Sequence, residues 1–236
     1  MMKRPLIGII GDYNPGNPTH VATTDGVTHA ATSMHEAVDA KWLATDFSDL
    51  SAQVQDCSGL FISPGSPYRD MDAVLEVIRF ARTANVPLIG TCGGFQHLVI
   101  EYARNVVGFK DAQHAEIDPY ASTLFITRLA CSLVGQALDI QIQPCSKASF
   151  AYGGVSSATE DFYCNFGLAP EHASTLTQAG LTISGKDSNG EARIVEVPEH
   201  PFFMGTLFVP QSRSKPDAPH PLIMEFVRQC RAFHRG

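Results

Sequence analysis

The first half of the chain alternates short, continuous apolar runs with longer segments in which apolar residues repeat every three or four positions. Short apolar runs are typical of buried parallel strands, and the longer repeat predicts amphipathic helices. We expect strands at residues 6–10, 41–45, 59–63 and 86–90, and helices at residues 23–40, 50–57, 72–84 and 95–103. This alternation predicts an α/β fold with a doubly wound, mostly parallel sheet flanked by helices.

The second half is richer in short apolar segments bounded by turns, which predicts less regular β-structure. Expected strands lie at residues 123–129, 138–142, 181–184, 192–197 and 205–208, and a closing helix at residues 221–233. Loops are expected at residues 13–20 and 108–120. No internal repeat or domain boundary is visible, so we expect residues 1–236 to form a single domain.

Cys92 lies where the fourth predicted strand turns into a helix. The turn consists of small residues, Thr91-Cys92-Gly93-Gly94, and the helix-period segment follows it. A cysteine at such a strand-turn-helix is typical of a nucleophile elbow, which holds the side chain above the sheet edge. The helix N-terminus favours the thiolate through its dipole and its free N–H groups. A buried, unreactive cysteine at a packed turn fits the local pattern equally well, so both interpretations stay open.

Composition and charge narrow the function classes. The net charge is −7 with no basic run, which argues against binding to nucleic acid or to an anionic membrane. No apolar run approaches the roughly 20 residues of a membrane helix, and we expect no signal peptide because the first residues lead into a short strand. The six cysteines show no metal-binding spacing, so we expect reduced thiols, a cytoplasmic protein, and neither metal nor cofactor.

Two stretches carry a resemblance to a known family. The first runs from residue 87 to residue 96, PLIGTCGGFQ, and continues as VIEYARN at residues 99–105. The second comprises residues 195–203, 208–216, 220–222 and 226–227. In order and spacing they resemble the glutaminase domain of CTP synthase, a class I glutamine amidotransferase, over about residues 5–230. The resemblance implies a flavodoxin-like, three-layer fold. CTP synthesis by this chain alone is not expected, because it has neither a GxxxxGKS/T loop nor room for a synthetase (amidoligase) domain.

The resemblance also implies an oxyanion hole beside Cys92. Family members form it from two backbone N–H groups, which correspond here to Gly65 or Ser66 and to Gly93. Amide donors that are already aimed at a developing oxyanion stabilise it without reorganisation, each by roughly 3 kcal/mol. An ordinary strand-to-helix turn is the alternative for residues 64–67.

The residues implied in substrate binding match the family only in part. Gln96 matches the family's Gln beside the nucleophile, and Glu116 matches a Glu that binds the substrate's α-amino group. The family's Arg-His-Arg-Tyr-Glu stretch corresponds to residues 160–164, so Phe162 replaces the Arg that grips the α-carboxylate, and Tyr163 follows it. Without its cation, a bound carboxylate loses about 1.5–3 kcal/mol from one charged hydrogen bond. We therefore do not expect ordinary glutamine hydrolysis.

The catalytic triad implied by the resemblance is incomplete. The family uses a Cys nucleophile, a His general base and a Glu that orients the His, the last two in a His-Pro-Glu sequence after a late strand. Here the nucleophile is Cys92, but Val209 and Gln211 stand at the His and Glu positions. Val cannot transfer a proton, and Gln cannot supply the orienting charge. His200 is expected to be a loop histidine, because a His-Pro pair precedes that strand in the family too.

Other groups are candidates for the missing chemistry. His114 lies two residues before Glu116 in a segment that borders the family's pocket, so it is a candidate replacement base, with a solvated loop histidine as the alternative. His97, five positions after Cys92 on the helix, is expected to face away from the elbow. Cys164 stands where the family has Glu, which places a second thiol near the site and adds a disulfide with Cys92 as a further alternative.

Three functions compete. The first is a divergent, Cys92-dependent hydrolase or transferase that acts on a small amide-like or amine-bearing substrate with a replacement base. We favour it, because an inactive site has no need of a cysteine at that turn. The second is a catalytically inactive pseudo-glutaminase, a ligand-binding or regulatory module, as the losses at Val209, Gln211 and Phe162 indicate. The third is a glutaminase subunit that supplies ammonia to a separate synthetase. The expected partners are a small-molecule substrate or ligand and, beyond it, a partner protein or a second copy of the chain.

Overall fold

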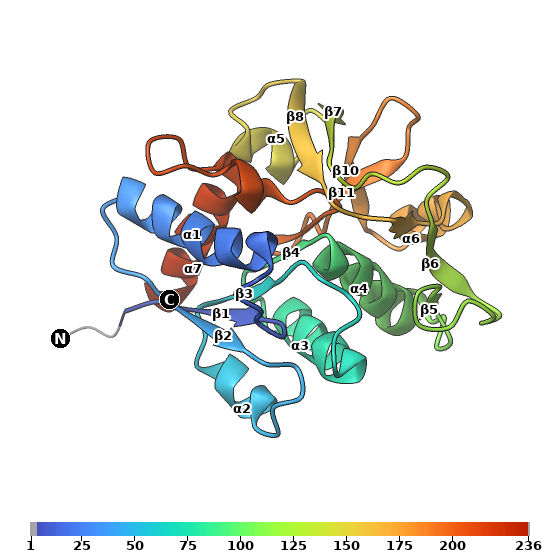
Figure 1. Ribbon diagram of the computed structural model, residues 1–236, viewed down its shortest axis with the longest axis horizontal. Helices are drawn as coiled ribbons and strands as arrows, with labels where there is room; N and C mark the ends of the chain where they lie inside the picture. Colours follow the sequence, from blue (N-terminus) through green and yellow to red (C-terminus); the bar gives the residue numbers. More distant parts are fainter. Residues whose placement is uncertain (1–3, 236) are drawn as a thin grey trace.

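Five parallel strands form one half of a nine-stranded sheet in the computed structural model, which describes residues 4–235 (Figure 1). Their order across the sheet is β2 (Asp39–Leu43), β1 (Leu6–Ile10), β3 (Gly59–Ile62), β4 (Leu88–Thr91) and β12 (Phe203–Thr206). β3, β4 and β12 are buried along their whole length, as expected for strands with helices on both faces. The predicted α/β sheet is confirmed in this half.

The other half of the sheet is antiparallel, so the sheet as a whole is mixed. It continues from β12 through β11 (Ala192–Glu196), β10 (Thr182–Lys186), β7 (Gln136–Ile142) and β8 (Ser157–Phe162). The sequence prediction missed β8, because its residues SATEDF contain no apolar run. The end of β8 returns to the end of β12: the N–H of Val209 donates to the carbonyl of Asp161 at 2.9 Å.

Helices cover both faces of the parallel half. On one face α1 (Pro18–Ser33) packs against α7 (Pro221–Arg235), and on the other α3 (Met71–Thr83) packs against α4 (Gly93–Tyr102), with α2 (Leu50–Gln55) beside α3 (Figure 1). An ion pair joins α3 to α4, with Arg82 Nη2 2.7 Å from Glu101 Oε1. Glu101 is fully buried, and the pairing with Arg82 offsets the cost of burying its carboxylate.

α1 begins at Pro18, before the predicted start at residue 23, and ends at Ser33, before the predicted end at residue 40. Asn17 caps it, because its side-chain oxygen accepts a hydrogen bond from the N–H of Thr19 at 3.0 Å. The face that α1 buries consists mainly of small and polar residues, and hydrophobic periodicity therefore locates the helix poorly. These residues are Thr19, His20, Thr23, Gly26, Val27, Ala30 and Ala31.

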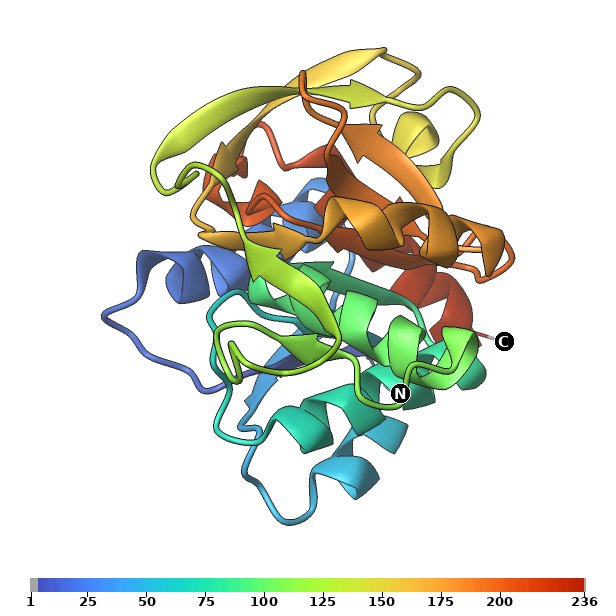
Figure 2. The same ribbon diagram turned by 90° about the vertical axis from the view of Figure 1, so that its right-hand side faces the viewer.

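A second, three-stranded sheet lies over α4 (Figure 2). It consists of β5 (Gln113–His114), β6 (Leu124–Arg128) and β9 (Phe166–Leu168), and it occupies part of the segment predicted as a loop. The remaining short elements are helices: η1 (Ala103–Val107), α5 (Lys147–Ala151), η2 (Pro170–His172), α6 (Ala173–Gln178) and η3 (Pro210–Arg213).

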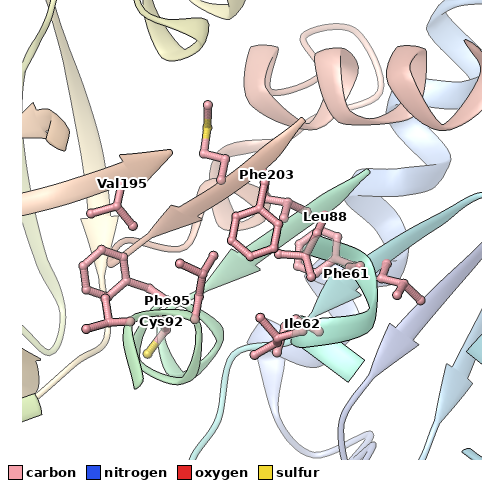
Figure 3. Close-up of a cluster of buried hydrophobic side chains, with 14 of the residues drawn as sticks. Phe61, Ile62, Leu88, Cys92, Phe95, Val195 and Phe203 are labelled. Atoms are coloured by element: carbon pink, nitrogen blue, oxygen red, sulfur yellow. The ribbon is translucent and has the colours of Figure 1, made fainter. Parts of the chain in front are cut away.

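The core fixes the place of Cys92. Buried side chains from β3, β4, α4, β11 and β12 form one cluster, and Cys92 lies beside Phe95 within it (Figure 3). A Cβ atom on Gly94 would lie 2.4 Å from the carbonyl oxygen of Ile62, and one on Gly90 would lie 2.8 Å from the backbone of Gly94. Only glycines allow the first turn of α4 to approach β3 and β4 so closely, and this approach places Cys92 at the ends of the strands.

Candidate active site

Cys92 is the residue at which β4 turns into α4. Its backbone has φ 52° and ψ −105°, a conformation that non-glycine residues rarely adopt and that costs of the order of 1–3 kcal/mol. Its N–H donates to the carbonyl of Thr206 at 2.8 Å, and its carbonyl accepts from the N–H of Gln96 at 3.2 Å. Strand pairing on one side and the helix on the other thus hold the strained residue in place. The predicted strand-turn-helix at Cys92 is confirmed.

The surroundings of Cys92 favour its thiolate. A hydrogen bond from the Cys164 thiol, the largest of the causes, lowers the pKa of Cys92 below its ordinary value against the opposing effect of burial. The backbone N–H groups of Gly93 and Gly65 lower this pKa further, while the charge of Glu116 raises it. Cys92 is 9% exposed as a whole residue, so its thiolate is largely shielded from solvent.

The ends of β3 and β4 converge on the Cys92 sulfur. Gly65, which follows β3, has φ +100°, a left-handed conformation that favours glycine, and a Cβ atom on Gly93 would lie 3.0 Å from the Gly65 carbonyl oxygen. The two N–H groups predicted to form an oxyanion hole therefore both reach this sulfur. They can stabilise negative charge at this position, whether on the thiolate or on an adjacent oxygen atom.

His20 contacts the loop that contains Gly65, on the side of the Pro64 carbonyl. No motif in the sequence pointed to His20. It is buried, its Nδ1 accepts the N–H of Asn14 at 3.0 Å, and its Nε2 lies 3.0 Å from the carbonyl oxygen of Pro64. Since Nδ1 is an acceptor, Nε2 carries the proton and donates to this carbonyl. Burial lowers the pKa of His20, which favours the neutral ring that this arrangement requires. The Pro64 carbonyl and the Gly65 N–H belong to one peptide group, so His20 fixes the direction of that N–H.

Glu116 lies at the solvent side of the site. Its carboxylate accepts a hydrogen bond from the hydroxyl of Ser66 at 2.7 Å, and it is exposed. Its charge acts on Cys92, and its partner Ser66 directly follows Gly65, whose N–H reaches the Cys92 sulfur. A carboxylate here can hold an ammonium group.

His114 is paired with Gln96 rather than with Cys92. Its Nε2 lies 3.0 Å from Gln96 Oε1, and its Nδ1 accepts the N–H of Glu116 at 3.0 Å. Burial, followed by the nearby charge of His97, lowers the pKa of His114 to about 3. With both ring nitrogens engaged and the ring neutral, the geometry argues against His114 as the base for Cys92. Its effect is to position Glu116.

Gln96 and His97 are also committed to internal contacts. The amide of Gln96 donates to the carbonyl of Phe166 at 2.9 Å, so both ends of its side chain are used within the protein. His97 donates from Nδ1 to the carbonyl of Gly93 at 2.8 Å, and its ring lies edge-on to Tyr68 at 4.7 Å. Burial lowers the pKa of His97 to about 4. Among residues 4–235, no imidazole is hydrogen-bonded to the Cys92 sulfur.

Neither Val209 nor Gln211 offers an acid or a base to the site. Val209 is fully buried, and Gln211 donates from Nε2 to the hydroxyls of Thr23 and Thr91, both at 3.0 Å. Thr91 directly precedes Cys92, so Gln211 ties the elbow to α1. The Gln211 Oε1 atom is buried without a hydrogen-bond partner among the described residues.

Residues 162–164, in the stretch that matches the family's substrate-binding residues, differ in the direction of their side chains. Phe162 is fully buried, packed edge-on against Phe208 at 5.8 Å, so it belongs to the core and its assignment to substrate binding is corrected. Tyr163 is 40% exposed, and Cys164 turns inward to Cys92. His200 lies in the loop between β11 and β12, as predicted, where it donates to the carbonyl of Ala81 at 3.1 Å.

One cavity does not include Cys92 in its lining. It has a volume of about 500 Å³ and is lined by residues 129–133, by β7 and by residues 187–193, where Arg193 pairs with Asp187 and Glu191. Over residues 4–235, no cluster of His, Cys, Asp and Glu side chains is arranged to hold a metal ion. Within the same range, no helix has the length and apolar character needed to cross a membrane.

A family model described as glutamine amidotransferase class-I matches residues 20–229, so the chain belongs to the class I glutamine amidotransferase family. Within the family it is similar to CTP synthases. It is 28% identical to that of Sulfolobus acidocaldarius over 237 residues, 95% of this chain and 45% of the relative. It is 30% identical to that of Nitratidesulfovibrio vulgaris over 257 residues, 99% of this chain and 47% of the relative. The chain therefore spans less than half the length of these relatives.

Solved structures confirm the fold. The glutaminase domain of Trypanosoma brucei CTPS with bound acivicin superposes with a TM-score of 0.86 at 23% identity, covering 96% of this chain and 93% of that one. A putative GMP synthase subunit from Thermoplasma acidophilum superposes with a TM-score of 0.67 at 16% identity, covering 99% and 97%. The resemblance to the CTP synthase glutaminase domain and the three-layer fold that it implied are both confirmed.

Proposed function

We propose that this protein is a Cys92-dependent acyl-transfer enzyme, a hydrolase or transferase, that acts on a small substrate with an amide-like or ester-like carbonyl and an amine. One observation carries the proposal. Cys92 is held at φ 52° with the N–H groups of Gly65 and Gly93 directed at its sulfur. A cysteine that only fills the core gains nothing from a strained backbone or from two amide donors.

The chemistry follows from this geometry. The Cys92 thiolate attacks the substrate carbonyl carbon, and the carbonyl oxygen becomes an oxyanion that accepts hydrogen bonds from the Gly65 and Gly93 N–H groups. The C–S bond remains when the leaving group departs, which gives a thioester. Water or a second nucleophile then releases the acyl group and restores the thiolate. Each amide donor can contribute roughly 3 kcal/mol to the first step.

The charge distribution restricts the substrate. Glu116 lies where it can pair with an ammonium group, which supports an amine-bearing substrate. No imidazole is placed to protonate the leaving group, so a poor leaving group such as ammonia departs slowly. We therefore expect a substrate whose leaving group departs as a stable anion or is already protonated. Phe162 offers no cation for an α-carboxylate. Ordinary glutamine is thus a poor fit.

A single-turnover experiment tests the proposal. The reduced protein is mixed with p-nitrophenyl esters of glycine and of acetate, and release of p-nitrophenolate is followed together with the intact mass. We expect a burst with one acyl group on Cys92, faster for the glycine ester, and no burst in Cys92→Ser. Cys131→Ser, which changes an exposed cysteine, is the matched control. If neither ester gave a burst, the proposal would be rejected.

A binding module without turnover is the second candidate. It is favoured by the engagement of both ring nitrogens of His114 and both ends of the Gln96 amide, which leaves no free base beside Cys92. Acivicin, bound in the glutaminase domain of Trypanosoma brucei CTPS, is a suitable test ligand. A rise in melting temperature that is lost in Glu116→Gln, without any acylation of Cys92, would support this candidate.

The third candidate, a glutaminase subunit for a separate synthetase, draws on the relatives. CTP synthases are more than twice as long as this chain, and one structural neighbour is a putative synthase subunit. Release of ammonia from L-glutamine by the purified protein would support this role. We expect none above the level of Cys92→Ser.

A further inference from the structure

We infer that Cys92 and Cys164 form a reversible intramolecular disulfide, so that the site is active only when reduced. The inference deepens the proposed function, because it rests on the reactive Cys92 thiolate that the acyl-transfer reaction also uses. The chemical class of the reactant is a hydroperoxide, and a dithiol restores the reduced state.

The two cysteines are anchored at consecutive residues of the same chain segment. The N–H of Cys92 donates to the carbonyl of Thr206 at 2.8 Å, and the Cys164 sulfur lies 3.1 Å from the carbonyl oxygen of Leu207. Thr206 and Leu207 are consecutive residues at the end of β12. The two cysteines are thus fixed to the same point of the sheet from two sides, and their side chains are hydrogen-bonded to each other.

The two thiols differ in the way that a disulfide-forming pair requires. The pKa of Cys92 is lowered, chiefly by the hydrogen bond from Cys164, so Cys92 supplies the thiolate. Burial, followed by the hydrogen bond to Cys92 and its charge, raises the pKa of Cys164 well above its ordinary value, so Cys164 keeps its proton. Once Cys92 is converted to a neutral sulfenic acid, the charge next to Cys164 disappears, and with it the electrostatic obstacle to losing that proton.

The reaction proceeds in two steps. The Cys92 sulfur attacks the terminal oxygen of the hydroperoxide, the O–O bond breaks, OH is transferred to sulfur, and the remaining alkoxide or hydroxide takes a proton from water. The Cys164 sulfur then loses its proton and attacks the Cys92 sulfur. The S–S bond forms, and the sulfenic hydroxyl leaves with the proton as water. A dithiol returns two electrons and two protons to restore both thiols.

The chain contains a matched control pair. Cys57 and Cys230 also interact electrostatically, and burial raises the pKa of Cys230 well above its ordinary value. Both are buried, at 4% and 0% exposure. Proximity alone would let this pair oxidise too, whereas the mechanism above requires a thiolate and leaves it reduced.

The test is oxidation of the reduced protein with equimolar hydrogen peroxide, followed by alkylation and peptide mapping. We expect two of the six thiols to be lost as a Cys92–Cys164 disulfide, with loss of the p-nitrophenyl ester burst and recovery of both by dithiothreitol. In Cys164→Ser, whose hydroxyl can still donate to the Cys92 sulfur, Cys92 should instead be trapped as a sulfenic acid by dimedone; in Cys164→Ala, which lacks this donor, trapping should be slower. Cys57 and Cys230 should stay alkylatable throughout.

Oxidation of Cys92 to the sulfinic acid in the wild-type protein, with Cys164 still a free thiol, would overturn the inference. So would a disulfide between any other pair. The two hypotheses fail separately: a disulfide without an ester burst in the reduced protein rejects only the acyl-transfer function. A burst without the disulfide rejects only the redox inference.

Discussion

The imidazole of His20 lies 3.0 Å from the carbonyl oxygen of Pro64, at the opposite end of the peptide group whose N–H reaches the sulfur of Cys92. In a trans peptide the C=O and N–H bonds point in opposite directions. A donor on the carbonyl therefore sets where the amide points, and it also polarises the N–H. His20 is thus a positioning residue that acts on Cys92 through one peptide group.

Replacing His20 should weaken the Cys92 thiolate. In His20→Ala the loop loses one hydrogen bond, of about 1 kcal/mol, and we expect Cys92 alkylation at pH 7 to slow by about fivefold, with the profile moved to higher pH. His20→Gln, which can donate from its amide, should recover part of the loss. The rate of iodoacetamide reaction against pH measures this. The exposed His35→Ala serves as control, and equal profiles in all variants would disprove the positioning role.

Gly94 should tolerate no side chain. In Gly94→Ala the Cβ atom would lie 2.4 Å from the Ile62 carbonyl oxygen, a backbone atom that cannot move without shifting β3. We expect a loss of at least about 3 kcal/mol in the free energy of unfolding, measured by urea denaturation. Gly108→Ala is the comparison: Gly108 has φ +101° but no atom near its Cβ position, so only backbone strain of about 1 kcal/mol is expected. Equal losses would show that packing at Gly94 is unimportant.

Restoring a carboxylate at the position of Gln211 should harm the protein by itself. Gln211 donates to Thr23 and Thr91, and the Thr23 hydroxyl is already used as a donor to Thr19 at 2.8 Å. In Gln211→Glu a buried carboxylate oxygen faces the Thr23 hydroxyl, whose proton is already used, so we expect a loss of about 2 kcal/mol in stability at pH 8. The loss should shrink at pH 5, where the buried carboxyl is protonated and can donate.

The matched control for this change is Gln211→Met, which has a similar size but no charge. Its loss in stability should be the same at both pH values. Urea denaturation of the two variants beside the wild type gives the comparison. A pH-independent loss in Gln211→Glu would show that the carboxylate finds a donor, such as the hydroxyl of Thr91.

Acid should destabilise the fold through two buried histidines. Burial lowers the pKa of His97 to about 4 and that of His114 to about 3, whereas an unfolded histidine titrates near 6.5. The unfolded state therefore binds more protons below pH 6.5, and the stability present above that pH is lost as pH falls towards 4 and 3. Between pH 7 and pH 5 each histidine should account for a loss of about 2 kcal/mol.

Urea denaturation of the wild type and of His114→Gln at both pH values checks this. The variant should lose about 2 kcal/mol less than the wild type over this interval. His35→Ala, an exposed change, should follow the wild type. An unchanged pH dependence in His114→Gln would mean that His114 is protonated in the folded state.

The sequence predicted the secondary structure best for strands that are buried on both faces of the sheet. The apolar runs of β1, β3 and β4 have no other explanation, and the small residues of the elbow locate Cys92. β8 was missed because SATEDF has neither an apolar run nor a strict apolar–polar alternation, and α1 was misplaced because it buries small polar residues. Hydrophobic periodicity detects neither pattern.

The residues of the site were easier to predict from the sequence than the hydrogen bonds between them. Gly65 and Gly93 follow the adjacent strands β3 and β4, so their N–H groups meet at Cys92. Glu116 follows β5 of the second sheet and accepts a hydrogen bond from Ser66. His114, in contrast, bonds to Gln96, which lies on another element. Local sequence does not encode such tertiary hydrogen bonds. No sequence signal pointed to His20 beyond its place near a helix N-terminus. The inward direction of Phe162 was not predicted, because its strand β8 had not been recognised.

The return of β8 to the end of β12 has a consequence for self-association. The outer strands of a sheet present unpaired backbone groups that can recruit another chain. At the end of β8, the Asp161 carbonyl is occupied by Val209 and its carboxylate by Arg213, 2.8 Å away. At the opposite edge, β2 exposes the charges of Asp39 and Lys41. Extension of the sheet from copy to copy is thus disfavoured at both margins, and a protein partner is expected to dock on helices or loops.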